Sequence, residues 1–166
     1  TQNFLPQVLT VASRTCRNLL TAQSAAAHGV DLYPRMFLMP DGRVFNAGPQ
    51  QTSRYLNTSG TGAWTNSATS TGGFRSYGTA VMYEPGKVLM VGGNDPPLKS
   101  AERIDLSLPV PTWQSAGLMF TARRQLNATM LPDGTVLVTG GSSGAGFNNA
   151  ASPALTAERW DPAQNT

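Results

Sequence analysis

The sequence predicts an all-β protein made of repeated four-stranded antiparallel sheets, the blades of a β-propeller. Three observations support this. A phrase of two short apolar strands joined by a tight turn occurs three times, with turn glycines 44 and 48 residues apart at Gly42, Gly86 and Gly134. Each phrase ends in a pair of small residues: Ala47-Gly48, Gly92-Gly93 and Gly140-Gly141. A later strand then carries an arginine at Arg54, Arg103 and Arg159, and a tryptophan follows the first two after ten residues. A period of about 50 residues with these markers is typical of kelch-type blades.

The phrase within Arg123–Gly141 shows how the residues specify a hairpin. Asn127–Leu131 and Thr135–Thr139 are rich in apolar and β-branched residues, which favour strands. Between them lies Pro132-Asp133-Gly134. Proline presets φ near −65° and glycine adopts the left-handed conformation, so a tight turn is expected here. Asp133, and Asp41 in the first repeat, are therefore interpreted as turn residues and not as a catalytic carboxylate pair.

The repeats place three consecutive blades at about 31–70, 75–120 and 123–166, the last of them incomplete. Residues 1–30 are interpreted as the remnant of a preceding blade and a linker. We expect strands at Gln7–Ala12 and Arg14–Leu20 in that remnant, with Cys16 near the position that tryptophan occupies in later repeats. Trp64 and Trp113 are expected to pack between adjacent blades.

About three blades cannot close a ring, because propellers have at least four. The sequence therefore leads us to expect an excerpt of a longer polypeptide, or a subunit that closes by association. The expected partners are the remainder of the same propeller or other subunits, which would cover the open blade faces.

Composition excludes several classes of function. Charged residues make up 13% of the chain and the net charge is +3. The arginines are scattered over the repeats and form no basic stripe, so nucleic-acid binding is not expected. No run of about 18 apolar residues is present that could span a membrane. Cys16 is the single cysteine, which rules out an internal disulfide.

The order of the phrases resembles a known family. LYPRMFLMPDGRVFNAG, YGTAVMYEPGKVLMVGG and NATMLPDGTVLVTGG, followed by AERWDPAQNT, are similar to the central blades of the galactose oxidase and glyoxal oxidase family. The resemblance covers approximately residues 31–166. It implies a secreted, kelch-type copper-radical oxidase, which oxidises a primary alcohol or aldehyde and reduces dioxygen to hydrogen peroxide.

The resemblance also implies which of the family's functional residues lie in this stretch. The family binds copper through two tyrosines and two histidines, one tyrosine being cross-linked to a cysteine, and its matching motifs fall outside these phrases. His28 is the single histidine and Cys16 lies in the wrong phrase. We therefore expect no catalytic residue, no metal ligand and no cofactor within this stretch, and copper only in the parent protein. Arg35 lies close to the position at which the family has a substrate-binding arginine, so the resemblance implies that Arg35 binds substrate. The alternative is that Arg35 forms a salt bridge at the end of a strand.

Two further residues, Tyr77 and Asn57, lie in phrases that match known patterns. Tyr77, in Arg75-Ser76-Tyr77, resembles the phrase that bears the family's cross-linked tyrosine, but packing on an inner strand is the favoured interpretation. Asn57-Thr58-Ser59 matches the glycan acceptor pattern on a turn. Two functions stay open: the scaffold and part of the substrate rim of an oxidase that takes a carbohydrate or a small alcohol or aldehyde, or a non-catalytic kelch propeller used for binding or assembly.

Overall fold

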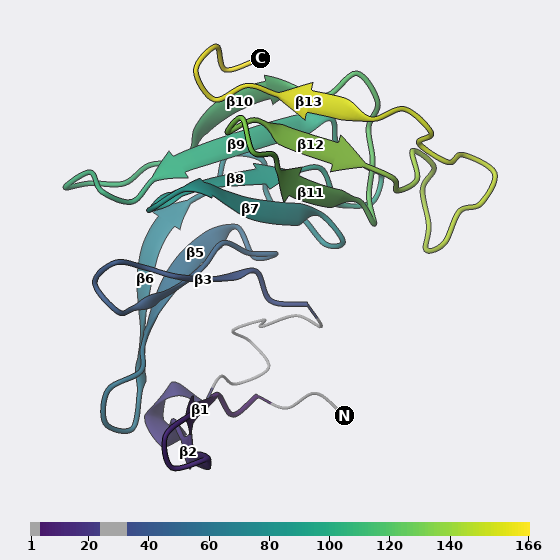
Figure 1. Cartoon of the computed structure of the whole chain (residues 1–166). Coiled ribbons are helices and arrows are strands. Elements are labelled where there is room, and N and C mark those ends of the chain that lie inside the picture. Colours follow the sequence, from purple (N-terminus) through teal and green to yellow (C-terminus); the bar gives the residue numbers. More distant parts are fainter. Residues whose placement is uncertain (1–3, 24–32) are drawn as a thin grey trace.

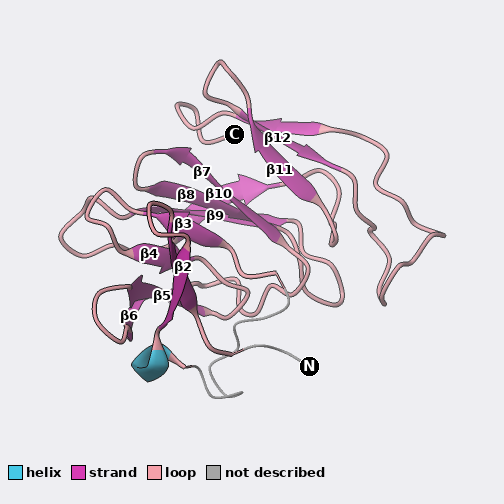
Figure 2. Cartoon of the chain, turned by 60° about the horizontal axis from the view of Figure 1, so that its bottom comes forward, coloured by secondary structure: helices cyan, strands magenta, loops and turns pink. Residues whose placement is uncertain are grey.

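The structure is a computed structural model that describes residues 4–23 and 33–166. Apart from one short helical turn, the described part of the chain contains strands and connecting loops only (Figure 2). No helix among the described residues is long and apolar enough to cross a membrane. The predicted all-β fold class is confirmed.

Two four-stranded antiparallel sheets and one three-stranded sheet follow each other along the chain, as Figure 1 shows. Blade 1 consists of β3 (Met36–Leu38), β4 (Val44–Asn46), β5 (Thr52–Asn57) and β6 (Ala63–Thr69). Blade 2 consists of β7 (Thr79–Glu84), β8 (Lys87–Val91), β9 (Ser100–Asp105) and β10 (Gln114–Leu118). Blade 3 consists of β11 (Asn127–Met130), β12 (Val136–Thr139) and β13 (Glu158–Trp160). Within each blade every strand pairs with the next strand in sequence.

A two-stranded hairpin precedes the blades. It pairs β1 (Gln7–Thr10) with β2 (Thr15–Asn18), and the helical turn η1 (Leu20–Ala22) follows. Both strands are shorter than the sequence suggested. Leu19 and Ala22 are fully buried against blade 1, where they form a small core with Leu56. Cys16 is exposed, so it does not take the place of a buried tryptophan.

The hairpin turns have the geometry that their residues predicted. Gly42, Gly86 and Gly134 have φ values of +83°, +78° and +83°. This left-handed region is strained for residues that carry a Cβ atom. Asp133 Oδ1 accepts a hydrogen bond from the Thr135 amide (3.0 Å), and Asp41 Oδ1 accepts one from the Arg43 amide (3.0 Å). Both carboxylates therefore stabilise turns, as expected.

The core lies between the blades, and β8 contributes to both sides of it. Val88 and Met90 belong to the apolar cluster shared with blade 1, together with Phe45 and Tyr55. Leu89 and Val91 point to the opposite face and join the cluster shared with blade 3. Because side chains alternate along a strand, a sheet packed on both faces needs an uninterrupted apolar run. All four of these β8 residues are buried.

Each tryptophan of the repeat reaches back to the preceding unit. The Trp113 indole donates from Nε1 to the Ser53 hydroxyl of blade 1 at 2.9 Å and is buried. Trp64 Nε1 donates to the Ala22 carbonyl of the preceding hairpin at 2.8 Å. The prediction that the tryptophans pack between adjacent blades is confirmed for Trp113, whereas Trp64 packs against the segment around η1 that precedes blade 1.

The glycine pairs allow the backbones of neighbouring segments to approach closely. A Cβ atom on Gly93 would lie 2.6 Å from the Gly78 nitrogen, and one on Gly92 would lie 2.5 Å from the Arg123 carbonyl oxygen. Real Cβ contacts are longer, so neither position accepts a side chain without a backbone shift. The Gly93 amide also donates to the Arg123 carbonyl at 2.9 Å and so ties blade 2 to blade 3.

Two arginine–glutamate pairs, each with a fully buried arginine, repeat the same connection between blades. Arg75 is fully buried and donates to Glu102 at 2.9 Å and to the Gly92 and Ser100 carbonyls at 3.0 Å each. Glu102 also accepts hydrogen bonds from Ser70 and Thr71, in the connection from blade 1. In the next repeat Arg123 pairs with Glu158, which accepts from the Phe120 and Thr121 amides. Each glutamate therefore acts as a clamp: its carboxylate accepts hydrogen bonds from the linker that leads into its own blade and holds that linker against the sheet.

Candidate functional site

A cavity of about 650 Å³ lies where the first strands of the three blades begin. Blade 1 contributes residues 33–37, blade 2 contributes 77–80 and blade 3 contributes 125–127. The long loop between β12 and β13 adds Phe147. Figure 1 shows β7 and β11 next to each other, and this loop as the large yellow-green excursion at the right. Residues far apart in the sequence therefore meet here, as ligand sites generally require.

Arg35 lies in the lining of this cavity and is partly exposed. Its Nη2 donates to the carbonyl oxygens of Arg75 (2.6 Å) and Gly78 (2.8 Å). These carbonyls flank Tyr77, so the guanidinium of blade 1 holds both ends of a turn in blade 2. This contact fixes the position of the arginine at the cavity. Substrate binding by Arg35 stays a prediction, and so does the alternative of a strand-end salt bridge.

Tyr77 is held in a strained conformation at the same place. Its φ of +52° is unusual for a residue with a bulky side chain. The turn precedes β7, so Tyr77 is not on an inner strand as the sequence suggested. Its carbonyl accepts a 2.6 Å hydrogen bond from the amide of Gln125, which is itself left-handed at φ +57°. Arg35, Tyr77 and Gln125 join three blades at one point, and local strain of this kind is concentrated at functional sites.

Two side chains fix the ring of Tyr77. The guanidinium carbon of Arg124 lies 5.1 Å from the ring centroid, in a cation–π geometry. The Phe147 ring lies at a centroid distance of 5.2 Å and is tilted by 56°. This is within the range that favourable aromatic pairs adopt. The Tyr77 ring is therefore preorganised by contacts from blade 3 and from its long loop.

The loop that carries Phe147 is anchored on both sides of that residue. The Gly146 amide donates to the Asp95 carboxylate at 3.1 Å, and the Gly146 carbonyl accepts from Arg124 at 3.0 Å. Asp95 and Arg124 form an ion pair at 2.7 Å. The hydrogen bond from Gly146 is the main cause of the lowered pKa of Asp95, and Arg124 lowers it further. The carboxylate is therefore charged at neutral pH and completes this anchor.

The described residues do not provide a donor set that fits copper. No group of three or more His, Cys, Asp or Glu residues within 4–23 and 33–166 could hold a metal ion. His28 lies outside the described residues, and Cys16 is exposed on the N-terminal hairpin. Copper needs correctly aimed imidazole or thiolate ligands. We therefore derive no step through a metal from these side chains.

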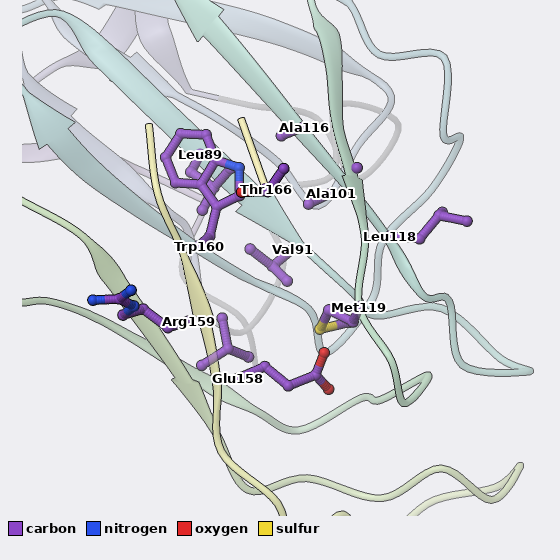
Figure 3. A pocket seen from close by; sticks show the side chains of 12 residues that line it. Leu89, Val91, Ala101, Ala116, Leu118, Met119, Glu158, Arg159, Trp160 and Thr166 are labelled. Carbon is purple, nitrogen blue, oxygen red and sulfur yellow. The ribbon is translucent and has the colours of Figure 1, made fainter. Parts of the chain in front are cut away.

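A second, smaller cavity of about 80 Å³ lies between blades 2 and 3 (Figure 3). Its lining includes Leu89, Val91, Val138 and Trp160, which belong to the apolar core between these blades. The figure shows the side chains of Leu89, Val91 and Trp160 turned toward one another from neighbouring sheets. This space is a packing gap between blades, so the cavity that contains Arg35 and Tyr77 is the better candidate.

Comparisons with known proteins agree with this geometry. No protein-family model matches the chain. Two curated galactose oxidases from Gibberella zeae are each 32% identical over 169 aligned positions, which cover 89% of this chain and 24% of each relative. The chain is homologous to part of galactose oxidase. It spans about a quarter of the length of these curated relatives.

A solved structure supports the same fold. It is described as a novel fungal alcohol oxidase with catalytic diversity among the AA5 family, in complex with copper. The superposition has a TM-score of 0.85 at 24% identity and covers 100% of this chain and 38% of that one. The blade architecture is therefore that of part of an AA5 oxidase structure.

The sequence had singled out Arg35 and Tyr77, and the structure brings them to one cavity. It had not singled out Arg124, which precedes β11, or Asp95 and Phe147, which lie in two connectors between strands. An aromatic residue inside a loop rich in Gly, Ser and Asn was the one available signal. The contact of Phe147 with Tyr77 of blade 2 could not be deduced from the spacing of residues along the chain.

Proposed function

We propose that this chain forms blades of a secreted copper-radical oxidase of the galactose oxidase type, and that it supplies scaffold and part of the substrate rim. The reaction removes two electrons and two protons from a primary alcohol, which becomes an aldehyde, while dioxygen accepts them and becomes hydrogen peroxide. An aldehyde substrate would first add water to form its hydrate, which would lose two electrons and two protons to dioxygen and become the acid. In this proposal the copper ligands lie elsewhere in the complete gene product.

The observation that carries the proposal is the anchored Arg35 in a large cavity of a galactose oxidase homologue. A guanidinium presents several donors in a planar fork that suits a pair of oxygen atoms. Because Nη2 is held by the Arg75 and Gly78 carbonyls, little side-chain entropy remains to be lost when substrate binds. Arg35 would hold and orient the substrate oxygens, and would take no part in electron transfer.

The test measures copper content and peroxide formation with the complete gene product. Arg35→Lys, which keeps the charge but loses the fork, is expected to lower kcat/KM by about 10-fold to 100-fold, as loss of a charged hydrogen bond does. Most of the effect should fall on KM, because the arginine binds substrate in the ground state. Arg43→Lys, at an exposed pair with Asp41, is the matched control and should leave both constants unchanged.

Two results would contradict the proposal. A complete gene product without stoichiometric copper and without peroxide formation would exclude oxidase activity. An Arg35→Lys variant that loses thermal stability but keeps KM would show that the residue only connects blades 1 and 2. The 166-residue chain by itself should bind copper no better than a buffer blank and should form no peroxide.

A second candidate function is binding or assembly by a kelch propeller, and one observation favours it. β13 is the edge strand of a three-stranded sheet, and Leu118 and Leu155 are 76% and 88% exposed. Edge strands and exposed apolar residues favour association. In this alternative, other segments or subunits cover the open blade faces. Mass in solution tests it, because a stable monomer over a wide concentration range would count against closure between chains.

A further inference from the structure

Two segments of the chain match Asn-X-Ser/Thr, the pattern at which a eukaryotic secretory pathway attaches an oligosaccharide to asparagine. They are Asn57-Thr58-Ser59 and Asn127-Ala128-Thr129. The oligosaccharide is attached as a chain enters the secretory pathway, so the folded protein must afterwards leave room for it. The two segments have very different surroundings in the structure, and these surroundings decide between them.

The first segment lies at an exposed turn. Asn57 is the last residue of β5, and both Asn57 and Ser59 are exposed. Asn57 Oδ1 accepts a hydrogen bond from the Ser59 amide at 2.9 Å, a local turn that asparagine side chains commonly form. No residue in the described part of the chain accepts a hydrogen bond from Asn57 Nδ2, the atom that an N-linked sugar is bonded to. The acceptor nitrogen is therefore available on an exposed side chain.

This turn joins the two outer strands of blade 1, β5 and β6, and is held from below by the N-terminal hairpin. Arg17 donates to the Thr58 carbonyl at 2.7 Å and also to the Gly60 carbonyl. Both bonds are made to backbone oxygens, so they leave the Asn57 amide nitrogen unused. None of residues 57–62 belongs to the described lining of the candidate cavity. An oligosaccharide at this turn would therefore leave that cavity open.

The second segment lies within a sheet. Asn127 is the first residue of β11 and pairs with Thr139 of β12. Ala128 packs against the apolar core between blades 2 and 3. Asn127 also lines the candidate cavity, where the three blades meet. An oligosaccharide is bulky and hydrophilic, so at Asn127 it would have to occupy the space between the blades. The fold therefore accommodates an oligosaccharide at Asn57 and not at Asn127.

We infer that Asn57 carries an N-linked oligosaccharide in the secreted protein and that Asn127 carries none. In the transfer, Asn57 Nδ2 forms a bond to the anomeric carbon of an oligosaccharide that is linked to a lipid pyrophosphate. The bond from that carbon to the pyrophosphate oxygen breaks, the lipid pyrophosphate leaves, and the amide nitrogen loses one proton. This inference rests on the proposed function only for secretion and needs none of its copper chemistry.

The experiment expresses the complete gene product in yeast behind a yeast secretion signal and treats it with peptide N-glycosidase in oxygen-18 water. This enzyme removes the oligosaccharide and leaves a labelled aspartate where the modified asparagine was. Peptide mass spectrometry should find the label at Asn57 in most copies and none at Asn127. Ser59→Ala should abolish the label, because the acceptor pattern needs the hydroxyl, although the backbone bond to Asn57 Oδ1 is kept. Ser59→Thr is the matched control and should retain the label.

The inference is wrong if Asn57 is unlabelled in the wild type, if Asn127 is labelled as strongly as Asn57, or if the label at Asn57 persists in Ser59→Ala. Protein retained inside the cells is analysed in the same way, so poor secretion of a variant does not affect the measurement. Copper and peroxide are measured on the same samples. Oxidase activity without an oligosaccharide on Asn57 contradicts this inference alone, whereas an oligosaccharide on Asn57 without copper or peroxide contradicts the proposed oxidase alone.

Discussion

Replacing Glu102 by glutamine tests whether the buried clamps hold the blades together. Glu102 is 3% exposed and is the ion-pair partner of Arg75, which is 0% exposed. It also accepts from Ser70 and Thr71 in the linker from blade 1. Glutamine keeps the shape but removes the charge. The Arg75 guanidinium would then remain buried without a counter-charge, and its carbonyl partners only partly compensate.

The expected loss in the free energy of unfolding is large. Removing one partner of a buried ion pair costs about 3–5 kcal/mol, because the remaining charge is uncompensated. For a chain of this length each kcal/mol lowers Tm by about 2–4 °C, so the variant should melt about 6–20 °C lower. The exposed pair of Lys87 with Glu84, at 2.6 Å, provides the matched control. Glu84→Gln should cost less than about 1 kcal/mol.

The pH dependence gives an independent measurement. Burial alone would raise the pKa of Glu102, but hydrogen bonds from Ser70, Thr71 and Arg75 outweigh it and hold the pKa below its ordinary value of 4.5. The unfolded chain therefore binds the proton more readily. The contribution of Glu102 is complete above pH 4.5 and is lost as the pH falls through the lower pKa of the folded state.

Thermal and denaturant unfolding of wild type, Glu102→Gln and Glu84→Gln should be followed from pH 7 to pH 3. The difference between wild type and Glu102→Gln should shrink as the pH falls, since protonation removes the same charge from the wild type. If Glu102→Gln is no less stable than Glu84→Gln at pH 7, or if the difference does not depend on pH, the reasoning about the clamp is refuted.

The remaining predictions concern the close approach of backbone segments at Gly93 and the hydrogen bond of Trp113. Gly93→Ala places a methyl group against the Gly78 backbone in addition to a left-handed φ, whereas Gly134→Ala meets only the unfavourable φ with open space around it. Unfolding should therefore show a loss of about 1–2 kcal/mol for Gly134→Ala and a clearly larger one for Gly93→Ala; equal losses would contradict the close approach. Trp113→Phe leaves the Ser53 hydroxyl, 1% exposed, without its indole donor and should cost about 1–3 kcal/mol. A Trp113→Phe and Ser53→Ala double variant should cost less than the two single losses added together, and strict additivity would show that the bond contributes nothing.

The repeated blade could be predicted because its signals are local. The turn glycines need a positive φ, and the structure gives Gly42, Gly86 and Gly134 that conformation. Trp64 and Trp113 recur at one offset because each performs the same packing task in its repeat, and both bond back to the preceding unit. These constraints act over a few residues or repeat at one period, so spacing alone reveals them.

The candidate site could be predicted only in part. Arg35 was singled out through a family resemblance, and its contact with the Arg75 and Gly78 carbonyls could not be foreseen. Tyr77 was expected to pack on an inner strand but lies in a strained turn before β7. The sequence did not single out Phe147, because it lies in a connector rich in polar residues. Its position depends on ionic and amide contacts made across two blades.

The sequence by itself determined the strand order, the turns and the residues that fill the space between blades, because apolar alternation and left-handed glycines restrict the chain locally. Only the tertiary structure decided which connector side chains meet. The Tyr77–Phe147 pair joins a turn of blade 2 to a loop of blade 3, and Arg35 reaches that turn from blade 1. These contacts depend on how each sheet packs against the next one. The spacing of residues within one repeat carries no information about that packing.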